Sequence, residues 1–112
     1  MVQLSIQPIN FFSGKIQLDE KGEAQLLFQV TLSCGCPTCA GGRFDPKRFR
    51  VRVTLLKKGK DMGSFPARYS GKISQFACHI SGLEPGEYQI EIGALDPETG
   101  SAGRLNMKVR AE

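Results

Sequence analysis

The sequence contains no tryptophan and only one histidine, His79. Histidine is the side chain most used for proton transfer at neutral pH and a frequent zinc ligand, so its scarcity removes most schemes for a general-base enzyme or a zinc hydrolase. A nucleophile–base pair, a pair of carboxylates at a catalytic spacing and a phosphate-binding glycine loop are also missing. The sequence therefore favours a protein that is not an enzyme.

Long apolar segments are absent too. No stretch approaches the roughly 18 apolar residues that a membrane-spanning helix requires, and the chain does not open on a charged and then apolar signal peptide. We expect no membrane span.

The 112 residues suit one domain, which we assign to residues 1–112. The formal net charge of +4 is mild and carries no information about the fold.

The pattern that is present alternates between apolar and polar residues, which is typical of strands with one buried face. Thirteen glycines and six prolines separate these runs. The strands are predicted at residues 2–7 with 15–18 as a continuation, 23–33, 48–57, 73–81, 87–94 and 103–110. Residues 62–71 contain Pro66 and are expected to form a short edge strand or a loop. About seven or eight strands without a helix predict an all-β, two-sheet antiparallel sandwich.

A short motif narrows the choice among all-β sandwich folds. Residues 83–88 read Leu-Glu-Pro-Gly-Glu-Tyr, which resembles the turn before the sixth strand of fibronectin type III and bacterial immunoglobulin-like domains. The resemblance implies a sandwich of that type, with the hydroxyl of Tyr88 bonded back to the backbone as a tyrosine corner. The third-strand tryptophan is missing and residues 87–94 contain no cysteine, so the antibody-type disulfide between sheets is not expected. The resemblance concerns architecture, because such folds host many unrelated functions.

The charge pattern agrees with that topology. In a sandwich of this family, strand 87–94 lies between strands 48–57 and 103–110. Its outward residues include Glu87 and Glu91, whereas the outward residues of its two neighbours are basic: Arg50, Arg52, Arg104, Lys108 and Arg110. Opposite charges across strands stabilise pairing by roughly 0.2–1 kcal/mol each. We therefore expect an acidic central strand between two basic ones.

One connection has unusual chemistry. Cys34, Cys36 and Cys39 form a C-x-C-x-x-C pattern between strands 23–33 and 48–57. Thiolates are soft ligands that suit Zn²⁺ or Cu⁺, so we interpret these three cysteines as the ligands of a metal site. A structural zinc takes four ligands. An acidic side chain from Asp96 or Glu98, a water molecule or a second chain would have to complete such a site.

The fourth cysteine and the histidine are poor candidates for that ligand. Cys78 shares the core-facing side of its strand with Phe76 and Ile80, and antiparallel pairing places it opposite the middle of strand 23–33. Cys34 lies at the end of that strand, several residues away. His79 lies at the same height as Cys78 and points outward. We expect Cys78 to be an inert buried thiol.

Two other functions stay open. A local disulfide, Cys34–Cys39 or Cys36–Cys39, would close the loop of an exported structural or adhesion-type domain. Residues 36–39 also match a dithiol redox motif, although the helix that usually follows such a motif is not predicted. The cellular compartment stays open with these alternatives, because a metal site favours the cytoplasm and a disulfide favours export.

A basic stretch extends from Arg43 to Lys60, with Asp45 as its only acid. Nucleic-acid binding would use such a stretch with exposed aromatic residues, but Phe49 begins the core-facing series of its strand. Arg50 and Arg52 are expected to pair with the acidic strand, and the other lysines and arginines of the stretch belong to loops at opposite ends of strand 48–57. We expect a solvated face and no nucleic-acid partner.

A protein partner is expected to bind through the loops 34–47 and 95–102.

Overall fold

The computed structural model describes residues 3–112. This part of the chain contains eight strands and one short 3-10 helix. Their bounds are β1 Leu4–Pro8, β2 Lys15–Ile16, β3 Ala24–Leu32, η1 Pro46–Arg48, β4 Arg50–Lys57, β5 Lys60–Tyr69, β6 Gln75–Ile80, β7 Gly86–Leu95 and β8 Ala102–Ala111. The all-β prediction is confirmed. Residue 2, at the start of the first predicted strand, lies outside the described residues. None of the helical structure in residues 3–112 has the length and apolar character needed to cross a membrane.

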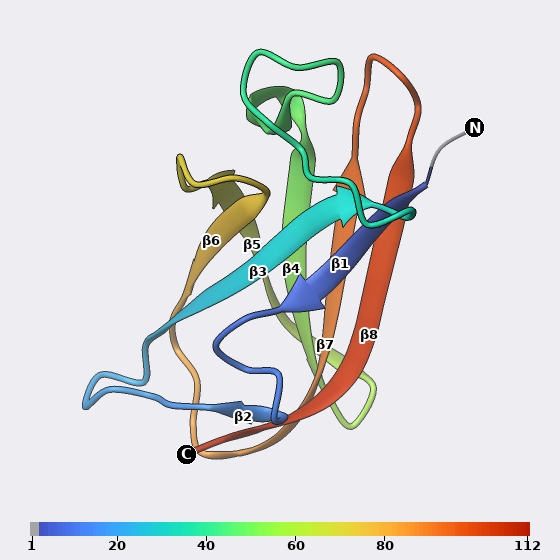
Figure 1. Cartoon of the computed structure of the whole chain (residues 1–112). Helices are drawn as coiled ribbons and strands as arrows, with labels where there is room; N and C mark the ends of the chain where they lie inside the picture. Colours follow the sequence, from blue (N-terminus) through green and yellow to red (C-terminus); the bar gives the residue numbers. More distant parts are fainter. Residues whose placement is uncertain (1–2) are drawn as a thin grey trace.

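The strands form one curled sheet in the order β1-β3-β6-β5-β4-β7-β8-β2 (Figure 1). The two halves of this sheet are joined by β5, which pairs with β4 along most of its length and with β6 at Arg68 and Tyr69. The neighbouring strands are antiparallel, except that β2 runs parallel to β8. The curl brings β1 against β8, where a Cβ on Gly103 would lie 2.3 Å from the carbonyl oxygen of Leu4.

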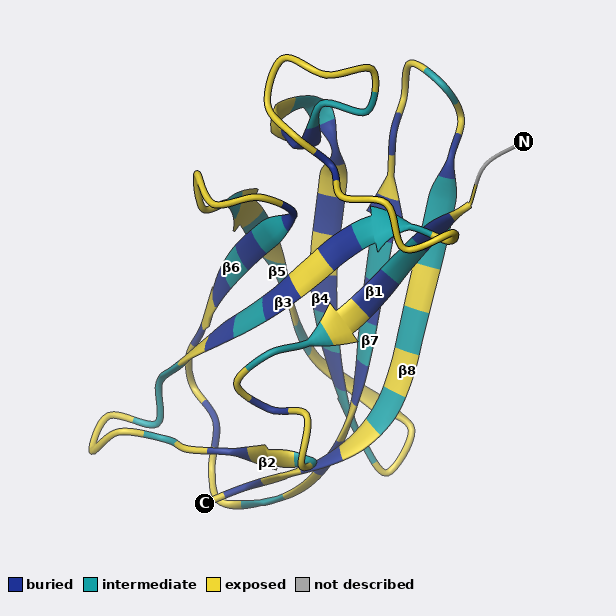
Figure 2. Ribbon diagram, viewed as in Figure 1, coloured by how far each residue is buried: buried dark blue, intermediate teal, exposed yellow. Residues whose placement is uncertain are grey.

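The core fills the inside of the curl because every second residue of the long strands points inward (Figure 2). Phe76 on β6 is at its centre and stacks on Phe28 and Phe49 at ring-centroid distances of 6.2 Å each. Full burial of one such side chain stabilises the fold by roughly 1.5–3 kcal/mol. Cys78 is also buried, as its place in the alternating pattern predicts. It lies opposite Leu26, nearer the start of β3 than the middle that we expected.

The motif at residues 83–88 forms the predicted tyrosine corner. The Tyr88 hydroxyl donates to the Glu84 carbonyl oxygen at 2.7 Å and accepts from the Glu84 amide at 3.2 Å. The strand order also agrees with the prediction, since β7 lies between β4 and β8. These two observations together place β7 as the central strand of its half of the sheet.

The expectation for residues 62–71 is wrong in length, because β5 is a strand of 10 residues whose end pairs with β6. Over the rest of its length β5 pairs with β4 alone, as an edge strand does. Pro66 is tolerated there because it lies opposite Arg52 of β4, and pairing with β6 begins only at Arg68. No ladder bond to β6 is therefore lost at the proline. Met62 is the extra residue of a bulge against Leu55 and Leu56.

The expected charge pairing is confirmed only in part. Glu87 lies opposite Arg110, as predicted. Arg50 instead lies opposite Leu95, and Arg52 lies opposite Gly93. The prediction of acidic partners for these two arginines is therefore wrong. In the register of β4 against β7, Glu91 lies opposite Thr54.

The open edge of β3 beyond the end of β1 is covered by one side chain. The Asn10 amide donates to the Gln25 carbonyl oxygen at 2.7 Å, and its oxygen accepts from the Leu27 amide at 2.9 Å. The Ile9 amide donates to the Leu27 carbonyl oxygen at 2.8 Å. Asn10 thus continues the ladder that β1 begins.

Candidate functional site

The candidate site begins where the chain reverses at the end of β3. The Gly35 amide donates to the Leu32 carbonyl oxygen at 2.8 Å, and the Leu32 amide donates to the Cys36 carbonyl oxygen at 2.9 Å. Gly35 has φ +91°, a conformation that glycine adopts without steric cost. The reversal leaves Cys34 and Cys36 exposed on either side of Gly35.

Beyond the reversal, the chain is held by a buried threonine. The Thr38 hydroxyl donates to the Val30 carbonyl oxygen at 2.7 Å, and its amide donates to the Ser74 Oγ at 2.8 Å. The Ser74 amide returns a hydrogen bond to the Thr38 carbonyl oxygen at 3.0 Å. Residues 36–38 therefore run back along the ends of β3 and β6, and both backbone polar groups of Thr38 are engaged.

Cys39 follows this anchor and is exposed. It leads into a loop at the upper pole of Figure 1. The Gly42 amide donates to the Cys39 carbonyl oxygen at 3.0 Å. The Asp45 carboxylate accepts from the Lys47 amide at 2.9 Å and from the Gly41 amide at 3.0 Å, and these hydrogen bonds lower the pKa of Asp45. The loop is thus closed by its own backbone contacts.

The four thiols have different surroundings, and none of them is in a disulfide. A hydrogen bond with the Cys36 side chain lowers the pKa of Cys34, and the same contact raises the pKa of Cys36. Burial raises the pKa of Cys78 to about 11. The thiols of Cys34 and Cys36 therefore affect each other's pKa. Within residues 3–112, no three His, Cys, Asp or Glu side chains are close enough to hold a metal ion.

The acidic side chain expected near the cysteine loop is engaged elsewhere. Asp96 is fully buried and binds the Arg48 guanidinium through both oxygens, at 2.8 Å from Nε and 2.9 Å from Nη2. It also accepts from the Thr99 hydroxyl at 2.7 Å. The Arg48 guanidinium holds the pKa of the Asp96 carboxyl far below its usual range. Arg48 reaches Glu98 at 3.3 Å as well, so one residue joins the loops 34–47 and 95–102.

This role of Arg48 is not predicted from the sequence, where the residue belongs to the basic stretch from Arg43 to Lys60. A signal for it exists in residues 96–100, Asp-Pro-Glu-Thr-Gly. An aspartate that opens such a turn accepts backbone hydrogen bonds, as Asp96 does from the Glu98 amide at 3.1 Å. A buried aspartate then requires a cation, and Arg48 belongs to the loop at the same pole.

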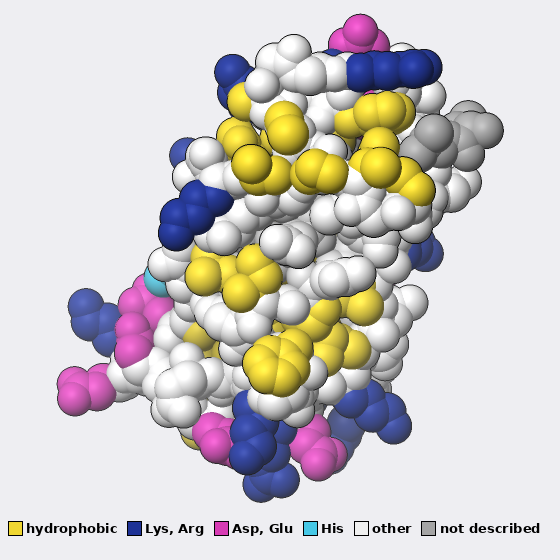
Figure 3. Space-filling view, viewed as in Figure 1, with side chains coloured by type: hydrophobic (Ala, Val, Ile, Leu, Met, Phe, Trp, Pro, Cys, Tyr) yellow, Lys and Arg dark blue, Asp and Glu magenta, His cyan; other side chains and the backbone are white. Residues whose placement is uncertain are grey.

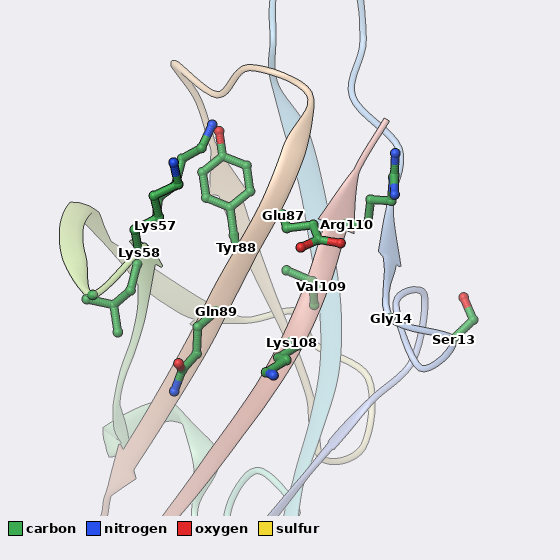
Figure 4. Close-up of a pocket in the computed structure, with 12 residues that line it drawn as sticks. Ser13, Gly14, Lys57, Lys58, Glu87, Tyr88, Gln89, Lys108, Val109 and Arg110 are labelled. Atoms are coloured by element: carbon green, nitrogen blue, oxygen red, sulfur yellow. The ribbon is translucent and has the colours of Figure 1, made fainter.

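The outer face of β4, β7 and β8 carries two main hollows and a third, smaller one. The larger has a volume of about 750 Å³ and lies at the pole opposite the cysteines, beside the β4–β5 turn (Figure 4). Lys57 Nζ lies 5.2 Å from the centre of the Tyr88 ring there. Figure 4 shows Glu87 between Tyr88 and Arg110. The second hollow, of about 480 Å³, lies nearer the cysteine pole, at Gly93.

The opposite face, over β1 and β3, has a different character. Figure 3 shows charged side chains gathered at its poles and edges and few across its middle. Hydrophobic side chains collect below the upper pole, where the connection from β3 to β4 passes, and basic side chains lie at that pole beside them.

The comparisons with known proteins identify the architecture. No family model matches the chain, and no curated protein shows significant similarity to it. Among solved structures, it is similar to the fibronectin(III)-like modules of Clostridium thermocellum CbhA, with a TM-score of 0.53 and 14% sequence identity over 99% of this chain. The chain has a fibronectin type III-like fold. It spans 46% of the matched chain, and at this identity the likeness concerns the fold alone. The chemistry of this fibronectin type III-like domain must therefore be argued from its own residues.

Proposed function

We propose that the chain is a non-catalytic accessory module that binds a soft metal ion at its cysteine loop, with Cys34 and Cys36 as the primary ligands and Cys39 as the third. The observation that supports it best is the exposed turn at residues 34–36. Two interacting thiols lie there on a reversal whose flanks are fixed by hydrogen bonds. Thiolates are soft ligands, which select Cu⁺ and Zn²⁺ over harder cations.

The surroundings of the loop favour Cu⁺ over Zn²⁺. A structural zinc requires four protein ligands, but Asp96 is held by Arg48 and Cys78 is buried in the core. His79 lies on β6 beside Glu23, at 3.2 Å. Cu⁺ is stable with fewer thiolates than zinc, so the three loop cysteines are sufficient for it.

Metal binding in this proposal moves one side chain. Cys39 is exposed and follows directly after the anchored Thr38, so it has to turn toward Cys34 and Cys36 when the ion binds. The backbone bond from Gly42 to Cys39 is the contact that this movement disturbs. Binding is therefore expected to change the conformation of the segment between Thr38 and Asp45.

The thiol alternatives use the same loop. A Cys34–Cys39 or Cys36–Cys39 disulfide, or a dithiol redox centre at Cys36 and Cys39, is distinguished from the metal site by the test below. In the proposed module, the half-sheets β1-β3-β6 and β4-β7-β8 act as the two layers of a sandwich. The loops 34–47 and 95–102, joined by Arg48, form one surface for a protein partner.

The test is a Cu⁺ titration of the reduced protein against a chromophoric chelator, followed by native mass spectrometry. We expect the wild-type chain to take the metal from the chelator. A Cys34→Ser/Cys36→Ser variant should lose this uptake, and Cys39→Ser should weaken it. The matched control is Cys78→Ala, which removes a thiol from the core and should retain uptake.

The result is decisive in either direction. Equal uptake by the wild type and the Cys34→Ser/Cys36→Ser variant would contradict the proposal, as would no uptake at all. In protein isolated without reductant, a mass two hydrogens below that of the reduced chain would indicate a disulfide in the loop and would contradict the metal site.

A further inference from the structure

The outer face of the sheet contains a row in which one side chain is missing. Along β7, Ile90, Ile92 and Ala94 point into the core, so Gly93 has an outward position. The strand register places Arg52 of β4 on one side of Gly93 and Arg104 of β8 on the other. A Cβ added at Gly93 would meet no atom within 4 Å. Two arginines therefore flank an open gap.

A third arginine extends this gap along the sheet. Arg50 is the next outward residue of β4 and lies opposite Leu95. It lines the hollow of about 480 Å³ together with Arg52, Gly93 and Arg104. A smaller hollow of about 150 Å³ shares the last three residues. The two form one depression, which we call the arginine groove: Arg50, Arg52, Gly93 and Arg104.

Within residues 3–112, the arginines of the groove form no ion pair. In this part of the chain, Arg48 and His79 are the only basic residues that form ion pairs with acidic side chains. Arg52 Nε donates to the uncharged Ser64 Oγ at 3.0 Å. Glu91 lines the smaller hollow, but it forms no ion pair with Arg52 or Arg104. The larger hollow at the other pole differs, since Glu87 lies opposite Arg110 there.

The shape and chemistry of the groove favour a carboxylate on an extended peptide. A guanidinium binds a carboxylate through two parallel hydrogen bonds, and such charge-assisted bonds are about twice as strong as neutral ones. Leu95, which is 38% exposed, and Ala102 supply apolar surface beside the arginines. An extended chain directs every second side chain to one face, so acidic residues can point into the groove in succession.

A nucleic acid fits the same surface less well. Single-stranded nucleic acids stack their bases on exposed aromatic side chains. Among the described residues that line the two hollows of the groove, none is aromatic. The surface therefore supplies charge and guanidinium geometry without a stacking platform.

We propose that the arginine groove binds the carboxylate side chains of an acidic, extended segment of a partner protein, centred over Gly93. This site is separate from the cysteine loop, and it does not depend on metal binding. It gives the domain a second binding surface, on the outer face of β4, β7 and β8.

The test uses a fluorescent octapeptide of alternating aspartate and leucine, with an asparagine–leucine peptide as the neutral probe. We expect the acidic peptide to raise fluorescence anisotropy on binding, less so at high salt. Arg52→Gln and Arg104→Gln should each weaken its affinity about tenfold or more. Gly93→Val keeps every charge but fills the gap, and it should weaken binding similarly.

The matched control is Lys108→Gln, on the same strand and face as Arg104 but outside the groove. Its affinity for the acidic peptide should stay within about twofold of the wild type. An equal loss in Lys108→Gln and Arg104→Gln would overturn the site in favour of diffuse net charge. Unchanged affinity in Gly93→Val, or tighter binding of a single-stranded oligonucleotide of equal charge, would also overturn it.

Discussion

Cys78 differs from the other three cysteines in its surroundings rather than in its chemistry. Its side chain is 1% exposed, and burial raises its pKa to about 11. The thiolate is the reactive form of cysteine, and at pH values below this pKa Cys78 is protonated. Reactivity therefore separates the loop thiols from the core thiol.

We expect iodoacetamide at about pH 8 to alkylate Cys34, Cys36 and Cys39 rapidly in the folded protein and Cys78 slowly. Peptide mapping over a time course measures the four rates. In urea all four should react alike, which provides the control. Alkylation of Cys78 at the rate of the loop cysteines in the native state would contradict its burial.

Asp96 illustrates how one residue makes stability depend on pH. The Arg48 guanidinium holds its pKa below the unfolded value of about 3.9. The stabilisation is therefore complete above that value and is lost as the pH falls through the folded-state pKa. We expect Asp96→Asn to lower the free energy of unfolding at neutral pH by about 2–4 kcal/mol and to flatten its decrease at acid pH.

Urea unfolding at about pH 6 and about pH 3 tests this expectation. Glu98→Gln is the control, because Glu98 is 72% exposed although it contacts the same arginine. That change should cost less than about 0.5 kcal/mol. A wild type and an Asp96→Asn variant with the same pH dependence would show that Asp96 is not the titrating group.

The segment from Cys36 to Asp45 depends on Thr38 as its anchor. Thr38→Val removes the hydroxyl bonded to Val30 and leaves the Val30 carbonyl and Ser74 Oγ without this partner. We expect a loss of about 1–3 kcal/mol in the free energy of unfolding and faster proteolysis within residues 39–45. Thr31→Val on β3 is the control, because the half-buried Thr31 bonds only the neighbouring Leu32 carbonyl. Unchanged proteolysis in Thr38→Val would mean that other contacts hold the loop.

Strand positions were predictable from the sequence where the alternating pattern was strong. The strands β3, β4, β7 and β8 and the tyrosine corner at Tyr88 follow the prediction closely. The prediction gave β5 too short a length, because Pro66 indicates an edge position and does not show that the strand continues to Arg68 and Tyr69, where it pairs with β6. Single-residue patterns do not contain that information.

Site residues were predictable only in part, for a related reason. The three exposed cysteines could be identified from their spacing, but not the mutual pKa effect of Cys34 and Cys36, because that depends on the turn at Gly35. The arginine groove depends on the register between β4 and β7. Its one sequence signal is Gly93, a glycine at an outward position within a strand, which marks a close approach or a gap.

At the scale of the whole molecule, the curl of the sheet depends on the contact between β1 and β8. A Cβ at Gly103 would collide with the Leu4 carbonyl oxygen at 2.3 Å. We expect Gly103→Ala to push β1 away and to lower the free energy of unfolding by about 2–4 kcal/mol. Gly93→Ala is the matched control, because its Cβ meets open space and should change stability by less than about 0.5 kcal/mol. Equal unfolding midpoints for the two variants would show that the β1–β8 approach is not a tight one.

The hydrogen bonds of Asn10 affect how readily two copies of the protein associate. An unpaired strand edge is a template on which a second copy of a chain can add a strand, the first step of aggregation. By binding the Gln25 carbonyl and the Leu27 amide, Asn10 occupies the groups that such a strand would need. The side chain at position 10 therefore protects this stretch of β3 from a second copy when the protein is crowded or stored at high concentration.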